Sequence, residues 1–254
     1  MRQSLAALVV MAMTIVPVRA SAAGQDQTTE AQIREGLLRS GRGEVAFQDA
    51  VRLIELIDRA AQIVSGRDAQ ARFALYRLRS MKNAAEAIEG PGTPAYARPW
   101  VDEHISQLVY SDPAGEWLLN SDVVLQIHDT WSDTVVADDI AWLMVENGWP
   151  AECEGDVPCY VRWQNGLHGE YLRRHPRGRH ADAANRGVAG ALNGAMSNLE
   201  KYSAVLGEFD PKTRCGELHT DLDPLVAAIR ASRSQAKARA LSATDRFARL
   251  CRRR

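Results

Sequence analysis

Histidine and acidic residues recur along the middle of the chain, and these side-chain types can hold a metal ion. They are Glu103, His104, His128, Asp129, Asp133, Asp138 and Asp139. Imidazole and carboxylate groups on neighbouring helices can bind a metal ion that activates a water molecule. As an alternative function, the set predicts a metal-dependent hydrolase that uses His104, His128 and Asp129. The competing interpretation is that the acids cap helices or face solvent, because a carboxylate is favourable in the first turn of a helix.

The His128-Asp129 dipeptide, preceded by His104, resembles the motif of the all-α metal-dependent phosphohydrolases that are named for this dipeptide. The resemblance implies a metal-assisted attack on phosphoester substrates. Motifs of other enzyme classes are missing from the sequence, since it contains no Gly-rich phosphate loop, no G-x-S-x-G and no H-E-x-x-H. No pattern supports Cys159 as a nucleophile. We therefore favour a protein that is not an enzyme.

A second group of metal-ligand types lies further along the chain. It contains Cys153, Glu154, Cys159, His168, His175 and His180. Thiolate and imidazole groups are the usual ligands of structural zinc. The spacing of the two cysteines is wider than in a zinc knuckle, and outside the cytosol a disulfide would compete for them. We expect a disulfide-tied loop with surface histidines, and no metal or other cofactor.

The same stretch contains strong signals for a turn between two helices. An aromatic-Leu pair precedes a proline and a glycine, and spaced alanines follow. The residues are Tyr171, Leu172, Pro176, Gly178, Ala181 and Ala184. Over residues 171–184 the pattern resembles the junction between helices in the tetratricopeptide-like proteins of bacterial envelopes. The resemblance implies helical hairpins in which these positions are structural, and we find no second clear copy at the period of about 34 residues that such arrays show.

Helical periodicity covers most of the chain. The spacing of apolar residues predicts helices over residues 44–64, 68–88, 99–110, 133–147, 158–174, 184–202 and 223–250. Residues 116–131 are core material in one or two helices, Ser132 is the expected N-cap of the helix that follows, and residues 23–30 should be frayed. Gly187, Gly190 and Gly194 indicate a closely packed neighbouring helix. Strand signals are almost absent, so we expect an all-α fold of irregular antiparallel helical hairpins, tetratricopeptide-like or a helical bundle.

The N-terminus is typical of a signal peptide. Arg2 precedes the apolar run Leu5 to Val18, and Ala20-Ser21-Ala22 fits the site that a signal peptidase cleaves. We expect residues 1–22 to be removed, leaving residues 23–254 as one exported domain, with a subdivision near residues 91–99 as an alternative. No cysteine lies near the cleavage region, so no lipid anchor is expected. The predicted location is the periplasm or the outside of a bacterial cell.

All four cysteines lie beyond the predicted signal peptide. An even number of cysteines in an exported chain predicts two disulfides with three connectivities. We favour Cys153–Cys159 and Cys215–Cys251, because the first pair closes a short loop and the second fastens the last helix to the segment before it. Free buried thiols are the alternative.

Net charge limits the classes of partner. Removal of residues 1–22 takes away Arg2 and Arg19 and no acid, which changes the formal net charge from −1 to −3. This near-neutral balance argues against a nucleic-acid partner. Residues 226–254 nevertheless carry nine Lys or Arg against the single Asp245. The segment could make weak contact with anionic lipid, or its cations could be a solvated helix face.

The sequence thus favours a binding or scaffold module over an enzyme, on the basis of analogy at the level of fold. The expected partner is another protein of the envelope. A groove between helix pairs would hold it, and aromatic side chains are its predicted lining. The candidate binding residues are Trp131, Trp142, Trp163 and Tyr171. The alternative is that these aromatic residues are simply core.

Overall fold

The computed structural model describes residues 22–39, 41–153, 156–202 and 211–251. This part of the chain is mostly helical, and the predicted all-α class is confirmed. The helices are α1 (Ala22–Leu37), α2 (Glu44–Ala61), α3 (Arg67–Ala87), α4 (Arg98–His104), α5 (Ser121–Thr130), α6 (Ala137–Asn147), α7 (Val157–Gln164), α8 (Glu170–Arg174), α9 (Ala181–Tyr202), α10 (Pro211–Ala231) and α11 (Lys237–Leu250).

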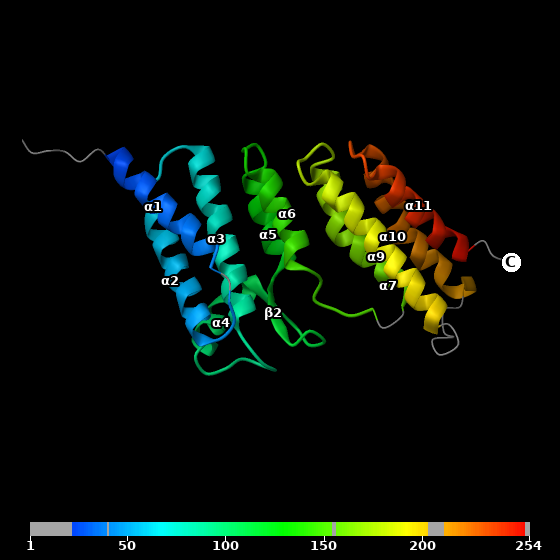
Figure 1. Cartoon of the computed structure of the whole chain (residues 1–254), viewed down its shortest axis with the longest axis horizontal. Coiled ribbons are helices and arrows are strands. Elements are labelled where there is room, and N and C mark those ends of the chain that lie inside the picture. Colours follow the sequence, from blue (N-terminus) through cyan, green and yellow to red (C-terminus); the bar gives the residue numbers. More distant parts are fainter. Residues whose placement is uncertain (1–21, 40, 154–155, 203–210, 252–254) are drawn as a thin grey trace, which may run out of the picture.

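The helices form a row of antiparallel pairs along the longest axis of the molecule (Figure 1). The turns between α2 and α3, α5 and α6, α8 and α9, and α10 and α11 all lie at the same end of the pairs (Figure 1). We call this end the turn edge, made of residues 62–66, 131–136, 175–180 and 232–236. The longer connections and α4 lie at the opposite end.

The first pair, α2 and α3, follows the predicted periodicity. Phe47 and Ile54 of α2 and Leu75 and Leu78 of α3 are buried in a common core. Gly66 begins the turn into α3 with a φ of 92°, a left-handed conformation that glycine adopts without a steric penalty. Residues 23–30, which were expected to be frayed, instead belong to α1, which contacts both α2 and α3.

A small β-hairpin corrects the prediction for the next segment. Strands β1 (Leu108–Ser111) and β2 (Glu116–Leu119) pair antiparallel, and Leu108 lies opposite Leu119. The predicted helix 99–110 therefore ends early, as α4 and a short 3-10 turn. The side-chain amide of Asn147 donates to the Leu119 carbonyl at 2.8 Å and accepts from the Leu119 N–H at 2.9 Å. This contact satisfies backbone groups of β2 that the hairpin leaves unpaired.

The second pair, α5 and α6, also begins later than predicted. Only residues 121–130 of the segment 116–131 are helical, and the Asn120 side chain caps α5 by accepting the Asp122 N–H at 3.0 Å. The next helix begins at Ala137, not at Asp133, so the prediction of Ser132 as its N-cap is wrong. The Ser132 hydroxyl donates to the Asp129 carbonyl at 3.2 Å and extends the end of α5 instead.

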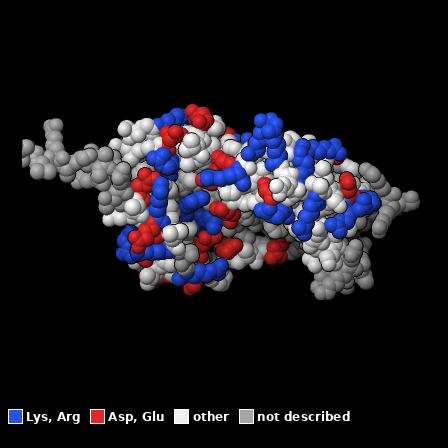
Figure 2. Space-filling view, turned by 45° about the horizontal axis from the view of Figure 1, so that its top comes forward, with Lys and Arg blue, Asp and Glu red and all other residues white. Residues whose placement is uncertain are grey.

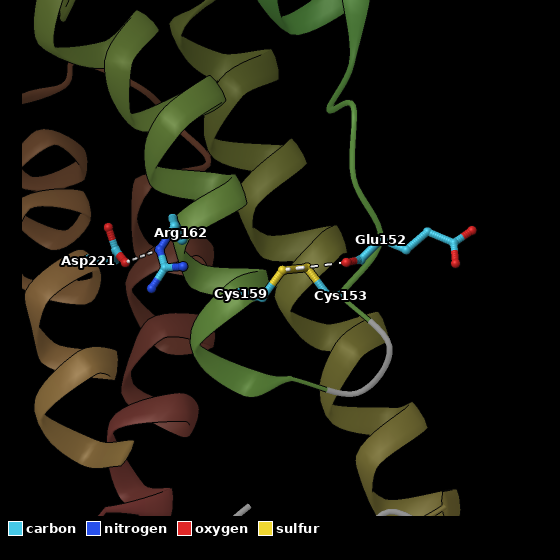
Figure 3. The surroundings of a disulfide bond; sticks show 5 residues. All are labelled: Glu152, Cys153, Cys159, Arg162 and Asp221. Atoms are coloured by element: carbon cyan, nitrogen blue, oxygen red, sulfur yellow. Dashed lines mark hydrogen bonds and ion pairs between the residues drawn. A yellow bond between two sulfur atoms is a disulfide. The ribbon is translucent and has the colours of Figure 1, made fainter. Parts of the chain in front are cut away.

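The third pair is α7 and α8 against α9. A π-helical turn over Asn165–Gly169 joins α7 to α8. The Cys153–Cys159 disulfide ties the preceding loop to the first turn of α7 (Figure 3). Arg162 of α7 donates to Asp221 of α10 at 3.1 Å, so the same helix is also fastened to the last pair (Figure 3).

The last pair, α10 and α11, replaces the single helix predicted over residues 223–250. The break falls where Ser232, fully buried, donates to the Ile229 carbonyl at 2.7 Å and accepts from Asn185 of α9 at 3.0 Å. The Cys215–Cys251 disulfide joins the first part of α10 to the end of α11. Both predicted disulfides are therefore confirmed, and no cysteine among the described residues is free.

Two disulfides are typical of a non-cytoplasmic, oxidising compartment. Among the described helices, none has the length and apolar character needed to cross a membrane. The predicted signal peptide, residues 1–22, lies outside the described residues except for Ala22.

Candidate functional site

A groove runs between α1, α3 and α6 on the surface of the molecule. Its volume is about 610 Å³. We call it the α1–α3–α6 groove. Its lining consists of Arg34, Leu37, Leu38, Arg72, Leu75, Tyr76, Arg79, Lys82, Asn83, Val136, Asp139, Leu143 and Glu146. The groove is thus lined by four cations and two acids around a set of aliphatic side chains.

The floor of the groove is apolar and its rim is exposed. Leu75 and Leu143 are almost completely buried and belong to the core beneath the groove. Leu38 lies at the end of α1 with 84% of its surface exposed. A leucine with this exposure next to a buried apolar floor offers a contact for another apolar side chain.

Most of the cations in the lining already have an acidic partner. Arg34 and Arg72 lie 2.8 and 3.4 Å from the Glu30 carboxylate, and Lys82 lies 2.5 Å from Glu86. Burial favours the neutral form of Glu30, but hydrogen bonds from Tyr76 and Arg34 outweigh it and hold the pKa of this carboxyl below its usual range. Arg34 also donates to the Tyr76 hydroxyl at 3.0 Å. This network fixes α1 against α3.

Arg79 differs from the other cations of the groove. It is half-buried, and no hydrogen bond or ion pair joins its guanidinium group to any residue that the structure describes. A planar guanidinium group that is partly desolvated and unpaired is well suited to bind a carboxylate through two parallel hydrogen bonds. Arg79 is therefore the residue of the groove that is most open to an anionic partner.

One end of the groove adjoins a cluster of histidines and acids at the turn edge. The cluster contains His128, Asp129, Asp138, Asp139, Tyr171, Arg174, His175 and His180. We call it the His–Asp cluster. Asp139 belongs to both sites, because it lines the groove and accepts from His180 Nε2 at 3.0 Å. Arg179 forms an ion pair with the same carboxylate.

His180 is fixed by an aromatic contact as well as by Asp139. Its ring stacks on Trp142 with centroids 4.8 Å apart and an interplanar angle of 6°. Burial lowers the pKa of His180 below its ordinary value, which favours the neutral ring. Trp142, one of the predicted binding residues, is thus half-buried and packs between the His–Asp cluster and the core.

Asp138 holds the turn between α8 and α9. Its carboxylate accepts the hydroxyl of Tyr171 and, at 2.7 Å, the N–H of Arg179. Tyr171 is fully buried, and burial followed by the contact with Asp138 raises its pKa. A Cβ at Gly178 would lie 2.4 Å from the Tyr171 hydroxyl, so the turn needs glycine at this position. The predicted turn residues therefore perform a structural role.

His128 and His175 form the other side of the cluster. Their Nε2 atoms lie 2.8 Å apart, and His128 Nδ1 lies 3.0 Å from the Asp129 carboxylate. Arg174 forms ion pairs with Asp129 and with Glu170. Burial lowers the pKa of His175, which lies among the charged groups of Asp138 and Arg174. The sequence neighbours His128 and Asp129 are thus joined to α8.

His168 lies in the π-helical turn between α7 and α8, close to α9. A Cβ at Gly187 would lie 2.2 Å from His168 Nε2, so this glycine makes room for the ring. Burial lowers the pKa of His168 to about 4, and its Nδ1 atom has no hydrogen-bond partner among the described residues. Gly190 and Gly194 have open space where a Cβ would lie, so the close packing predicted for them is wrong.

The remaining candidate residues are dispersed. His104 stacks on Trp100 and contacts its carbonyl at 2.9 Å, whereas Asp133 pairs with Arg67 at 2.7 Å. Arg67 also lies over the ring of Trp131, 5.0 Å from its centroid. Trp163 packs against the core of the N-terminal half. Neither tryptophan lines the α1–α3–α6 groove.

The two metal-ligand hypotheses have different outcomes. Cys153 and Cys159 are oxidised to a disulfide, so they cannot supply thiolates to zinc. For the hydrolase alternative, the structure brings His128 and Asp129 together, while His104 makes its contacts elsewhere. Within the described ranges, no three His, Cys, Asp or Glu residues are grouped in a way that could hold a metal ion.

Comparison with known protein families, with curated proteins and with solved structures finds no match for this chain. The site must therefore be interpreted from its own geometry. Sequence reasoning did not find the groove, because Arg72, Arg79 and Leu143 are ordinary members of amphipathic helices. A detectable signal is the arginine-rich face of α3, which lies opposite its apolar seam.

Proposed function

We propose that the protein is a binding module of the bacterial envelope that holds an acidic, leucine-containing segment of another protein in the α1–α3–α6 groove. The observation that carries the proposal is the unpaired, half-buried guanidinium group of Arg79 above an apolar floor. An acidic side chain of the partner would pair with Arg79, and aliphatic side chains would cover Leu38 and the floor.

The charges of the groove support an acidic ligand over a basic one. Arg34 and Arg72 are paired with Glu30, Lys82 with Glu86, and Asp139 with Arg179 and His180, so Arg79 is the half-buried charge of the lining without a partner among the described residues. An unpaired cation in a concave, partly desolvated surface attracts an anionic partner and speeds its association. The aliphatic floor adds affinity for a segment that alternates acidic and apolar side chains, because burial of apolar surface favours binding.

Export to the periplasm or beyond is part of the same proposal. It is supported by the N-terminal sequence pattern and by the two disulfides. The tetratricopeptide-like resemblance of residues 171–184 also supports it, since the proteins it points to belong to bacterial envelopes. The row of antiparallel pairs is compatible with that resemblance (Figure 1).

The test uses a labelled 15-residue peptide that alternates glutamate and leucine, with fluorescence anisotropy as the measurement. We expect saturable binding that weakens as salt is added. The variant Arg79→Glu should weaken it at least tenfold, because a charge-assisted hydrogen bond contributes about 1.5–3 kcal/mol. The matched control is Arg59→Glu, which reverses an exposed arginine of α2 outside the groove.

Three results would contradict the proposal. They are absence of binding at millimolar peptide, equal binding of a peptide that alternates lysine and leucine, and equal losses in the Arg79→Glu and Arg59→Glu variants. The hydrolase alternative with His104, His128 and Asp129 predicts a different outcome. It requires a metal ion that stays bound in native mass spectrometry and is lost in a His128→Ala, Asp129→Ala double variant.

A further inference from the structure

Cations gather over the C-terminal half of the turn edge. Figure 2 shows Lys and Arg side chains grouped over the α8–α9 and α10–α11 turns, with few acids among them. The residues are Arg177, Arg179, Arg186, Arg230, Arg233, Lys237 and Arg239. The acids beside these turns are Asp138, which accepts the Arg179 N–H, Asp139, paired with Arg179 and His180, and Asp182, paired with Arg186. The surface therefore has a strong excess of positive charge.

Four of these arginines do not stabilise the fold through their side chains. Arg177, Arg230, Arg233 and Arg239 are exposed, and within the described residues no side-chain hydrogen bond or ion pair involves their guanidinium groups. The backbone of the region is nevertheless well fixed. The N–H of Arg233 donates to the Pro176 carbonyl at 2.7 Å, and Lys237 donates to the Arg230 carbonyl at 2.8 Å. The first of these bonds fastens the α10–α11 turn to the α8–α9 turn, so Arg233 and Arg177 lie on neighbouring turns.

The same edge carries exposed aliphatic side chains in the N-terminal half. Ile63 and Val135, in the α2–α3 and α5–α6 turns, are 74% and 72% exposed. Hydrogen bonds connect these two turns, because Arg67 donates to the Thr130 carbonyl at 2.7 Å and the Val135 N–H donates to Asp68 at 3.3 Å. The four turns lie along one edge of the row of helix pairs (Figure 1), with Ile63 and Val135 in its N-terminal half and the arginines in its C-terminal half.

We infer that the turn edge docks the protein onto an anionic phospholipid surface. Phosphate groups of the lipid would bind the four unpaired arginines, and Ile63 and Val135 would enter the headgroup layer. A polybasic surface is attracted to anionic lipid, and exposed aliphatic side chains strengthen such peripheral binding. A protruding edge suits the plane of a bilayer, whereas the α1–α3–α6 groove suits a peptide segment. This docking does not depend on the groove and its proposed ligand.

The cationic part of the proposed lipid-binding surface lies on two turns of the chain, whereas the sequence predicted a lipid contact along the basic C-terminal segment. Residues 226–254 do not form a single basic helix, because the chain reverses between α10 and α11. Arg230, Arg233 and Arg239 are brought to the reversal, next to Arg177 of the α8–α9 turn. The α8–α9 turn is therefore expected to contribute as much as the C-terminal segment.

The test measures co-sedimentation of the full chain with vesicles of phosphatidylcholine that contain 30% phosphatidylglycerol, and with vesicles of phosphatidylcholine alone. We expect binding only to the anionic vesicles, with a loss on addition of salt. Each arginine near an anionic surface is worth about 1 kcal/mol, or about a fivefold change in partition. The double variant Arg177→Gln, Arg233→Gln should therefore bind about 25-fold more weakly, without loss of folding, because it removes only exposed guanidinium groups.

The matched control is the double variant Arg42→Gln, Arg98→Gln. It removes two exposed arginines on the segments that lie at the opposite end of the helix pairs. It should keep wild-type binding, and Ile63→Ser, Val135→Ser should weaken binding to the anionic vesicles. Equal binding to both kinds of vesicle, or equal losses in the two arginine double variants, would overturn the inference. Binding of polyglutamate but of neither vesicle would overturn it in favour of an acidic protein surface.

Discussion

The Nε2 atoms of His128 and His175 lie 2.8 Å apart, although 47 positions separate the two residues in the chain. At this distance one imidazole donates and the other accepts, so the pair holds a single proton between the two rings. Burial lowers the pKa of His175, which favours the neutral ring at this contact. The junction of α5 with α8 therefore depends on at least one neutral histidine.

The first prediction concerns pH. Burial lowers the pKa values of His168, His175 and His180 in the folded protein, to about 4 for His168. The unfolded chain then binds more protons than the folded chain below about pH 6.5, so the free energy of unfolding falls as the pH falls from about 6.5 towards 4. For His168 alone the loss is about 3 kcal/mol. Urea unfolding followed by tryptophan fluorescence at several pH values measures it.

The variant His168→Gln separates this contribution from the others. Because glutamine does not titrate, the variant should show a shallower fall in stability between pH 6.5 and 4. The control is His219→Gln, which replaces a histidine of α10 whose side chain is 46% exposed, and the fall in stability is compared between the two variants. A profile for His168→Gln as steep as that of the wild type would show that His168 is not the buried neutral group described above.

The second prediction compares two glycines of the same helix. In Gly187→Ala the new methyl group would meet the His168 ring, which is packed and cannot withdraw freely, so the variant should be destabilised by about 1–3 kcal/mol. In Gly190→Ala the methyl group meets open space, and the gain in helix propensity should stabilise the protein by up to about 1 kcal/mol. Opposite signs in thermal unfolding are expected. The same sign for both would contradict the placement of His168 against α9.

The third prediction concerns the Tyr171 hydroxyl, which links Asp138 to the α8–α9 turn. In Tyr171→Phe the carboxylate loses its hydroxyl donor and the His180 N–H loses its acceptor, 3.1 Å away in the structure. We expect a loss of about 1–2 kcal/mol in the free energy of unfolding. The control Tyr160→Phe removes the hydroxyl of a half-buried tyrosine of α7 and should cost less. Equal losses would mean that the turn does not depend on this hydrogen bond.

The fourth prediction ranks the two disulfides. The Cys215–Cys251 bridge spans 36 residues and the Cys153–Cys159 bridge spans 6. On loop entropy the longer bridge should stabilise the protein by about 4 kcal/mol and the shorter by about 2 kcal/mol. Urea unfolding of the two double alanine variants measures the difference. A larger loss in Cys153→Ala, Cys159→Ala would show that the short bridge acts on the native packing of α7 and not mainly on the unfolded chain.

The elements that could be predicted from the sequence are those with a strong helical period. The helices α2 and α3 lie within a few residues of their predicted ranges, because an apolar seam and a glycine turn specify each of them locally. The favoured cysteine pairing was also correct. Both pairs join segments that the predicted helix order already brings together.

Elements whose limits depend on distant residues could not be predicted. The β-hairpin has only four residues in each strand, and its second strand is completed by Asn147 of α6. The break between α10 and α11 contains neither proline nor glycine, and depends on the contact of Ser232 with Asn185. In both cases a buried side chain from another helix forms hydrogen bonds with polar groups that have no partner in their own segment.

The candidate site shows the same limit. On sequence alone, its histidines and acids are divided between two separate hypotheses. The structure joins His128 and Asp138 from the first hypothesis to His175 from the second. The groove beside them depends on how α1 lies against α3 and α6, and the sequence contains no local signal for that arrangement.

Asp138 lies 41 residues before Arg179, whose N–H group it accepts. A growing chain presents its N-terminal part first, so α6 can be complete before residues 175–180 begin to fold. The carboxylate then serves as a template on which the α8–α9 turn closes, and α9 receives its direction from that turn. Assembly of the row is therefore expected to proceed from the N-terminal pairs to the C-terminal ones, in the order in which the chain is made.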